Sequence, residues 1–148
     1  MTLRILPLIA SGALAVTLAG CAPAGSAEPS AAALSPKQAA LLEKQLGGKV
    51  AGEPINCLQT SGRNYQTIRV SDDILLYRAS SRLVYQNKLR GGCPGLGRDD
   101  DIMVIRTYGT GTCKGDLFHL VDRTSGIRGP TCVFGEFVPY RKAVADGR

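Results

Sequence analysis

The run Ile74-Leu75-Leu76-Tyr77 is apolar at every position, whereas a strand with one wet face would alternate between apolar and polar residues. An unbroken apolar run bounded by turn residues is typical of a strand that is covered on both faces. Ile102-Met103-Val104-Ile105 has the same pattern. We therefore expect both runs to lie at the centre of the hydrophobic core.

The chain around these two runs has the pattern of a mainly β protein. From Ile55 onward, short β-prone runs alternate with turn residues, and no further helical period of useful length occurs. Ser71-Asp72-Asp73 and Ser80-Ser81 are short enough to connect consecutive hairpins. The pattern predicts one twisted antiparallel sheet, or a small, partly open barrel, of about six or seven strands. The expected strands cover residues 55–60, 65–71, 74–79, 82–87, 102–108, 117–122 and 133–138.

One short helix is expected over residues 36–46, closing one end of the sheet. Ser35 can cap it, Pro36 suits its first turn, and Gly47-Gly48 can end it. Helical spacing places three apolar side chains on one stripe and leaves four polar ones in water. The stripe is Ala39, Leu42 and Leu46, and the wet side chains are Lys37, Gln38, Lys44 and Gln45.

Leu18-Ala19-Gly20-Cys21 places a cysteine directly after small residues at the end of a short apolar run. Arg4 precedes that run, which is too short to span a bilayer, so the segment indicates export. The stretch resembles the lipobox of bacterial lipoproteins, in which a diacylglycerol is attached to the cysteine sulfur before the signal peptide is cut off. The resemblance implies a signal peptide over 1–20 and acylation of Cys21, for instance with palmitate. The alternative is an ordinary secretory signal that is cut after a small residue such as Ala27.

Residues 21–34 follow as the lipidated cysteine and a tether rich in Ala, Pro, Gly and Ser, and 35–148 as a single domain. Several acyl chains on one residue anchor a protein to a membrane without spanning it. Ala22 stands where an aspartate would signal retention in the inner membrane. For a Gram-negative host, the resemblance therefore implies a protein of the cell envelope, anchored in the outer membrane and facing the periplasm.

Cysteine counting agrees with an oxidising compartment. Of the 5 cysteines, Cys21 is assigned to the lipid, and the remaining even number predicts two disulfides among Cys57, Cys93, Cys113 and Cys132. The sequence alone cannot select among the possible pairings. We favour Cys57 with Cys93 and Cys113 with Cys132, because sequential closures suit a sheet of successive hairpins. The spacing fits neither a zinc ribbon nor a thioredoxin-like motif, and we expect no metal and no cofactor.

The chain is mildly basic, with a net charge of +6. The charge is too dispersed, and aromatic residues are too few, to predict nucleic-acid binding. A basic face towards anionic lipid head groups is one interpretation, and ordinary solvated charges are the other. The basic residues gather in the middle of the chain and near its end, at Arg78, Arg82, Lys88, Arg90, Arg98, Arg106, Arg141, Lys142 and Arg148.

Cys93-Pro94-Gly95-Leu96-Gly97 is a constrained turn that could present a binding surface. Pro94, Leu96 and Arg98 are its candidate binding residues, and an inhibitor of an envelope enzyme could use such a loop. The acidic run Asp99-Asp100-Asp101 follows, but its spacing does not match a calcium loop, and a solvated turn is favoured.

His119 is the only histidine and hence the only candidate general base with an ordinary pKa near neutrality. A small hydrolase site would need Asp116 or Asp122 to orient it and Ser125 to approach. No nucleophile motif supports that arrangement, and a strand histidine with local hydrogen bonds is the favoured interpretation.

The domain resembles small uncharacterised disulfide-containing envelope proteins of proteobacteria, a group that carries no activity to transfer. The leading hypothesis is a non-enzymatic envelope lipoprotein that binds a protein, a glycan or an anionic lipid. The small hydrolase and the inhibitor are the alternatives. The resemblance rests on Cys57, Asp72-Asp73, Tyr85, Asn87, Cys93-Pro94-Gly95-Leu96, the turn from Cys113 to Asp116, Cys132 and Phe137-Val138-Pro139-Tyr140.

Overall fold

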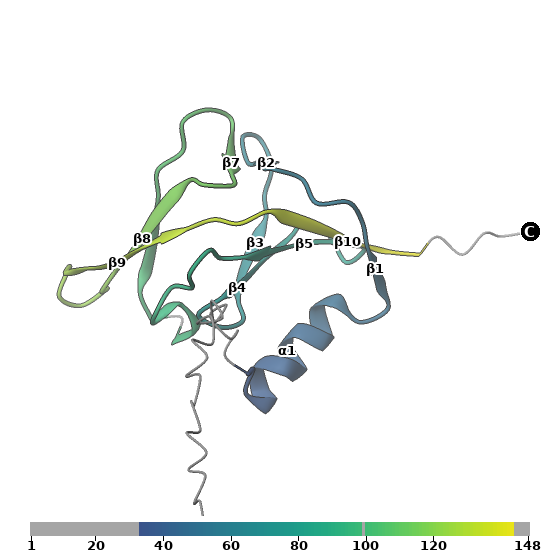
Figure 1. The fold of residues 1–148 in the computed structure, drawn as a ribbon, viewed down its shortest axis with the longest axis horizontal. Coiled ribbons are helices and arrows are strands. Elements are labelled where there is room, and N and C mark those ends of the chain that lie inside the picture. Colours follow the sequence, from purple (N-terminus) through teal and green to yellow (C-terminus); the bar gives the residue numbers. More distant parts are fainter. Residues whose placement is uncertain (1–32, 99, 144–148) are drawn as a thin grey trace, which may run out of the picture.

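The computed structural model describes residues 33–98 and 100–143 (Figure 1). The expected signal peptide, Cys21 and most of the tether lie outside these residues, as do Asp99 and Arg148. The described chain forms one α-helix, a short 3-10 helix and ten strands, which is the mainly β fold that the sequence predicts. The elements are α1 (Pro36–Leu46), β1 (Lys49–Ala51), β2 (Cys57–Gln59), β3 (Gln66–Arg69), β4 (Ile74–Arg78), β5 (Leu83–Lys88), η1 (Leu96–Arg98), β6 (Ile102–Ile105), β7 (Gly111–Cys113), β8 (Leu117–Val121), β9 (Arg128–Val133) and β10 (Phe137–Lys142).

The strands form three antiparallel sheets instead of one. Their orders are β1-β10-β5-β4-β3, β2-β7 and β6-β8-β9. The two expected hairpins are confirmed, because β3 pairs with β4 and β4 with β5. No closed barrel forms among the described strands. The sequence did not predict β1 and β7, which have only 3 residues each, too few to show a period. It also did not predict β9, apart from its last residue, Val133.

The bounds of the expected strand over residues 133–138 are wrong, because this range covers the end of β9, a break and the start of β10. β9 ends at Val133 and β10 begins at Phe137. The strand is interrupted at Gly135 and Glu136, because the side chain of the buried Asn87 forms hydrogen bonds with their backbone groups. Its Nδ2 donates to the Gly135 carbonyl at 2.9 Å and to the Glu136 carbonyl at 3.2 Å, and its Oδ1 accepts from the Gly135 N–H at 3.1 Å.

The five-stranded sheet has a hydrophobic cluster on each face. Leu75 and Tyr77 point into the larger cluster, with Phe118, Phe134 and Phe137. On the other face lies a smaller cluster, against which helix α1 packs; its buried members are Val70, Ile74, Leu76 and Val84. The run 74–77 is therefore covered on both faces, and its expected place in the core is confirmed.

Helix α1 has the predicted bounds and cap. The Ser35 hydroxyl accepts from the Gln38 N–H at 3.4 Å, and the Gln38 side chain accepts from the Ser35 N–H at 2.9 Å, which completes a capping box. Leu42 and Leu46 pack on the sheet as expected. The rest of the predicted stripe is wrong, because Ala39 is exposed and Gln45 is buried. Leu41, which the predicted stripe leaves out, packs on the sheet beside Leu42 and Leu46.

Strand β6 does not have the expected burial. Met103 and Ile105 pack against the core, but Ile102 and Val104 are 45% and 37% exposed. The prediction of a strand covered on both faces is wrong here, because the three-stranded sheet is covered only on its inner side. On the outer side, Leu117 of the neighbouring strand β8 is 48% exposed as well.

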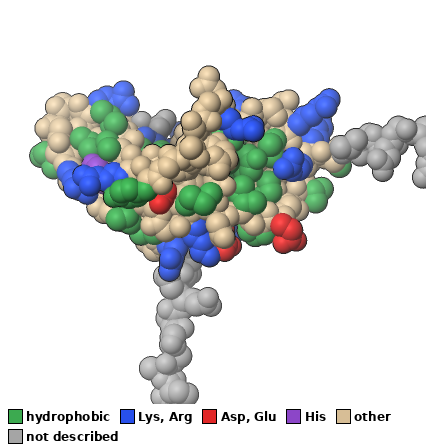
Figure 2. Space-filling model, turned by 90° about the horizontal axis from the view of Figure 1, so that it is seen from above, with side chains coloured by type: hydrophobic (Ala, Val, Ile, Leu, Met, Phe, Trp, Pro, Cys, Tyr) green, Lys and Arg blue, Asp and Glu red, His purple; other side chains and the backbone are tan. Residues whose placement is uncertain are grey.

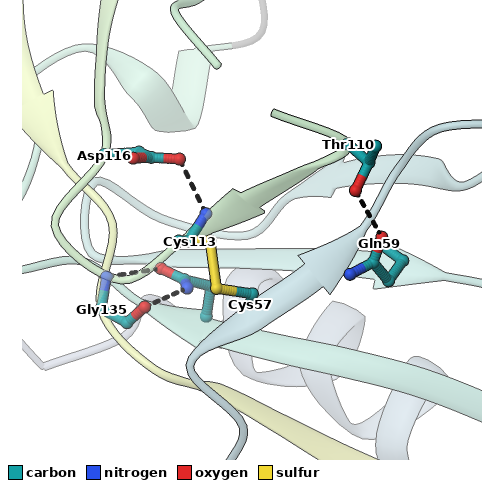
Figure 3. Close-up of a disulfide and its surroundings, with 7 residues drawn as sticks. Cys57, Gln59, Thr110, Cys113, Asp116 and Gly135 are labelled. Carbon is teal, nitrogen blue, oxygen red and sulfur yellow. Dashed lines mark hydrogen bonds between the residues drawn. A yellow bond between two sulfur atoms is a disulfide. The ribbon is translucent and has the colours of Figure 1, made fainter. Parts of the chain in front are cut away.

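The structure contains two disulfides, but the favoured pairing is wrong. Cys57 is bonded to Cys113, and Cys93 to Cys132. Cys57 and Cys113 lie directly opposite each other where β2 pairs with β7 (Figure 3). This strand pair joins segments that are 56 residues apart, so the rule of sequential hairpins does not apply to it. The Cys93–Cys132 bridge is buried in the larger hydrophobic cluster.

Candidate functional site

The outer side of the β6-β8-β9 sheet is an uncovered, partly apolar surface, which we call the open face. Strand β8 sends Phe118 and Leu120 inward, whereas Leu117 is 48% exposed on the outside. Registers place Val121 opposite Ile102, and His119 between Val104 and Thr131, so these side chains share one side of the sheet. The members of the open face are Ile102, Val104, Arg106, Leu117, His119, Val121, Arg128 and Thr131.

A shallow hollow of ≈ 320 Å³ lies on the open face around His119. Arg106, which directly follows β6, and Arg128 of β9 line the hollow together with Tyr108, which is 88% exposed. The Arg128 guanidinium donates to the Thr131 hydroxyl at 3.4 Å, which holds it over the sheet. Figure 2 shows the histidine in purple among blue basic and green hydrophobic side chains at one end of the molecule.

The hollow has a positive electrostatic environment. Partial desolvation, followed by the charges of Arg128 and Arg106, lowers the pKa of His119 below its ordinary value. Asp116 is the carboxylate among the lining residues, but its Oδ2 accepts a hydrogen bond from the Cys113 N–H at 2.8 Å (Figure 3). That bond holds the Asp116 carboxylate within the turn from Cys113 to Asp116. An anion in the hollow would therefore meet two guanidinium groups and one carboxylate, so that the arginines outnumber the acid.

The structure does not assemble the hydrolase site that would use His119. Asp122 Oδ1 accepts hydrogen bonds from the Ser125 N–H at 2.6 Å, the Ser125 hydroxyl at 2.8 Å and the Thr124 N–H at 2.9 Å. These bonds, with the Ser125 backbone as the largest cause, lower the pKa of Asp122. The proposed nucleophile and the proposed orienting group thus bind each other in the β8–β9 turn. Across the described residues, no hydrogen bond connects His119 to Asp116, Asp122 or Ser125.

The loop from Cys93 to Gly97 is rigid, and it offers less surface than expected. Leu96 is fully buried and belongs to the core, whereas Pro94 and Arg98 are exposed. The Gly97 N–H donates to Asp72 Oδ1 at 3.0 Å, which ties the loop to the β3–β4 turn. An inhibitory surface here would therefore consist of Pro94 and Arg98 without Leu96.

No metal cluster is found in the part of the chain that the structure describes: no group of three or more His, Cys, Asp and Glu side chains is placed to hold an ion. Of the acidic run, Asp101 and Asp100 are described, and their carbonyls accept hydrogen bonds from Arg69 and Arg123.

The basic residues singled out from the sequence do not gather in one place. Lys88 and Arg90 line a separate hollow of ≈ 470 Å³, where Lys114 forms an ion pair with Glu136 at 2.6 Å. Arg106 instead lines the same hollow as Arg128, a residue that the sequence did not single out. The two arginines are separated by strand β8, and only the pairing of three strands brings them together.

No protein-family model matches the chain, and no curated protein or solved structure is found to be similar to it. Within residues 33–98 and 100–143, no helix is long and apolar enough to cross a membrane.

Proposed function

We propose that the chain is a lipid-anchored, non-enzymatic binding module of the bacterial envelope, and that the open face is its binding surface. The observation that carries this proposal is the exposure of Ile102, Val104 and Leu117 beside the hollow lined by Arg106 and Arg128. A contiguous patch of exposed apolar side chains with charged residues at its rim is typical of an interaction surface, whereas scattered exposed apolar residues are not.

Binding is favoured over catalysis because the groups that would activate His119 are engaged elsewhere. Asp116 accepts from the Cys113 backbone, and Asp122 accepts from Ser125 and Thr124. General-base catalysis needs an oriented base within reach of a nucleophile. The open face supplies charge and apolar contact, which are the means of recognition.

The proposed location in the cell envelope rests on the resemblance of the segment before Cys21 to a lipobox. The two disulfides support it, since disulfides persist in oxidising compartments. Phase partition in a detergent that clouds on warming tests the anchor. The wild-type chain is expected in the detergent phase and the Cys21→Ser variant in the aqueous phase. An aqueous wild-type protein would refute the anchor and favour an ordinary secretory signal.

Site-specific photocrosslinking in living cells tests the binding surface. A photoreactive amino acid in place of Val104, on the open face, is expected to form adducts with a binding partner. The matched control replaces Val50, which is 64% exposed on strand β1 of another sheet. Adducts of equal yield from both positions, or from position 50 alone, would contradict the proposal.

A further inference from the structure

We propose that the open face docks onto the anionic phospholipid surface of the membrane that holds the anchor. This inference rests on the proposed function for the anchor, and it adds the identity of the partner. The domain would then lie against the bilayer in a fixed orientation, with the β6-β8-β9 sheet facing the lipid head groups.

The chemistry of the open face suits the boundary between head groups and acyl chains. Ile102, Val104 and Leu117 expose apolar side chains on the outer side of the sheet. Beside them, Tyr108 is 88% exposed, and Ile127 is 69% exposed next to Arg128. An aromatic ring with a polar tip and small apolar side chains are the groups that enter this boundary region.

The charge of the open face is complementary to an anionic surface. Arg106 and Arg128 flank a hollow large enough for a phosphate group, and the guanidinium fork matches phosphate oxygens in a two-bond geometry. Arg123 adds a third cation at the adjacent turn. Three carboxylates adjoin this face in sequence: Asp101 before β6, Asp116 before β8 and Asp122 after it. Asp116, which lines the hollow, accepts from the Cys113 N–H, and Asp122 accepts from Ser125 and Thr124.

The tether permits this orientation. From Cys21 to Ala33, the first described residue, an extended chain reaches about 40 Å. That length exceeds the roughly 30 Å diameter of a small domain, so any face of the domain can reach the bilayer. Each arginine near an anionic membrane strengthens binding about fivefold. Three arginines would hold a free domain weakly, but an anchored domain is already at high effective concentration at the surface, where weak contacts suffice.

The absence of tryptophan from the sequence makes a direct test simple. Two single-tryptophan variants of the full chain, Tyr108→Trp beside the open face and Val50→Trp on β1, are purified in detergent and reconstituted into vesicles. One vesicle type contains phosphatidylcholine alone, and the other also contains phosphatidylglycerol. Brominated acyl chains in both types quench a tryptophan that enters the boundary region.

We expect the tryptophan of Tyr108→Trp to shift to shorter wavelength and to lose at least half of its emission, in the anionic vesicles only. Val50→Trp is expected to stay unquenched in both. Adding Arg106→Gln and Arg128→Gln to the Tyr108→Trp chain should remove most of the quenching. The matched control adds Arg63→Gln and Arg82→Gln, which remove the same charge elsewhere on the surface, and it should leave the quenching unchanged.

Three outcomes would overturn the docking: no quenching of Tyr108→Trp, equal quenching of both tryptophans, or quenching that does not depend on phosphatidylglycerol. Adducts of Val104 with a protein alone, in the cell experiment, would also replace the lipid with a protein partner. The anchor is judged separately by detergent partition. If the chain proves not to be lipidated, the same variants are added from solution to a series of rising vesicle concentrations, because a free domain binds weakly. Quenching of Tyr108→Trp that does not rise with the anionic vesicles would then overturn the docking.

Discussion

The buried disulfide is expected to stabilise the fold more than the exposed one, although the exposed one closes the longer loop. Cys57 and Cys113 are 56 residues apart, and Cys93 and Cys132 are 39 apart. Loop entropy alone makes these bridges worth about 4.2 and about 3.9 kcal/mol of unfolding free energy. The two values are nearly equal, so packing decides the order.

Packing favours the Cys93–Cys132 bridge. Its cysteines are 0% and 2% exposed and belong to the larger hydrophobic cluster, whereas Cys57 is exposed. Replacing a buried cysteine by alanine removes a buried sulfur, at a cost of about 1 kcal/mol per site. The double variant Cys93→Ala/Cys132→Ala should therefore lose about 6 kcal/mol, and Cys57→Ala/Cys113→Ala about 4 kcal/mol.

Equilibrium urea denaturation, followed by circular dichroism and tyrosine fluorescence, measures both losses. Because a domain of this size has about 5–15 kcal/mol of stability, the buried-pair variant could lose its cooperative transition altogether. Graded reduction and alkylation of the wild-type chain give a second measure that needs no variant. Cys57 and Cys113 should be alkylated first, since a reductant must reach the sulfur. A larger loss for the exposed pair, or earlier alkylation of Cys93, would refute this reasoning.

Three further predictions concern single side chains. Asn87→Ala leaves the backbone groups of Gly135 and Glu136 without their side-chain partner in the core. The variant should lower the unfolding free energy by about 2–4 kcal/mol in a urea titration. An unchanged midpoint would contradict the role of Asn87. The Tyr77 hydroxyl is buried and has no hydrogen-bond partner among the described residues, and burial raises its pKa. Because Tyr77→Phe removes this unpaired buried hydroxyl, it should leave the unfolding free energy unchanged or raise it by about 1 kcal/mol. A lower melting temperature would disprove this. His119 should titrate below its ordinary pKa of 6.5 in proton NMR of its single imidazole signal. Because the unfolded chain then binds the proton more tightly, stability should fall as the pH drops below 6.5 towards the folded-state pKa, and a His119 that titrates above 6.5 would contradict the effect of the two arginines.

Local signals predicted much of the fold. The bounds of α1 follow from Ser35, Pro36 and Gly47, whose effects act within one helical turn. The hairpins β3–β4 and β4–β5 follow from the short turns between apolar runs. The candidate site was harder to predict from the sequence. His119 was visible because it is the only histidine, but nothing near Arg128 in the sequence marks it as a neighbour of Arg106.

The fold class, the helix, the central hairpins and the presence of two disulfides follow from the sequence, because each depends on residues close together in the chain or on a count. The disulfide partners depend on long-range pairing, since β2 meets β7 across 56 residues of chain. The exposure of one side of β6 likewise depends on how the sheets pack. An apolar run looks the same in the sequence whether a second layer covers its sheet or not. In the β6-β8-β9 sheet, Met103, Phe118 and Leu120 pack in the core, whereas Ile102, Val104 and Leu117 on the other side stay exposed.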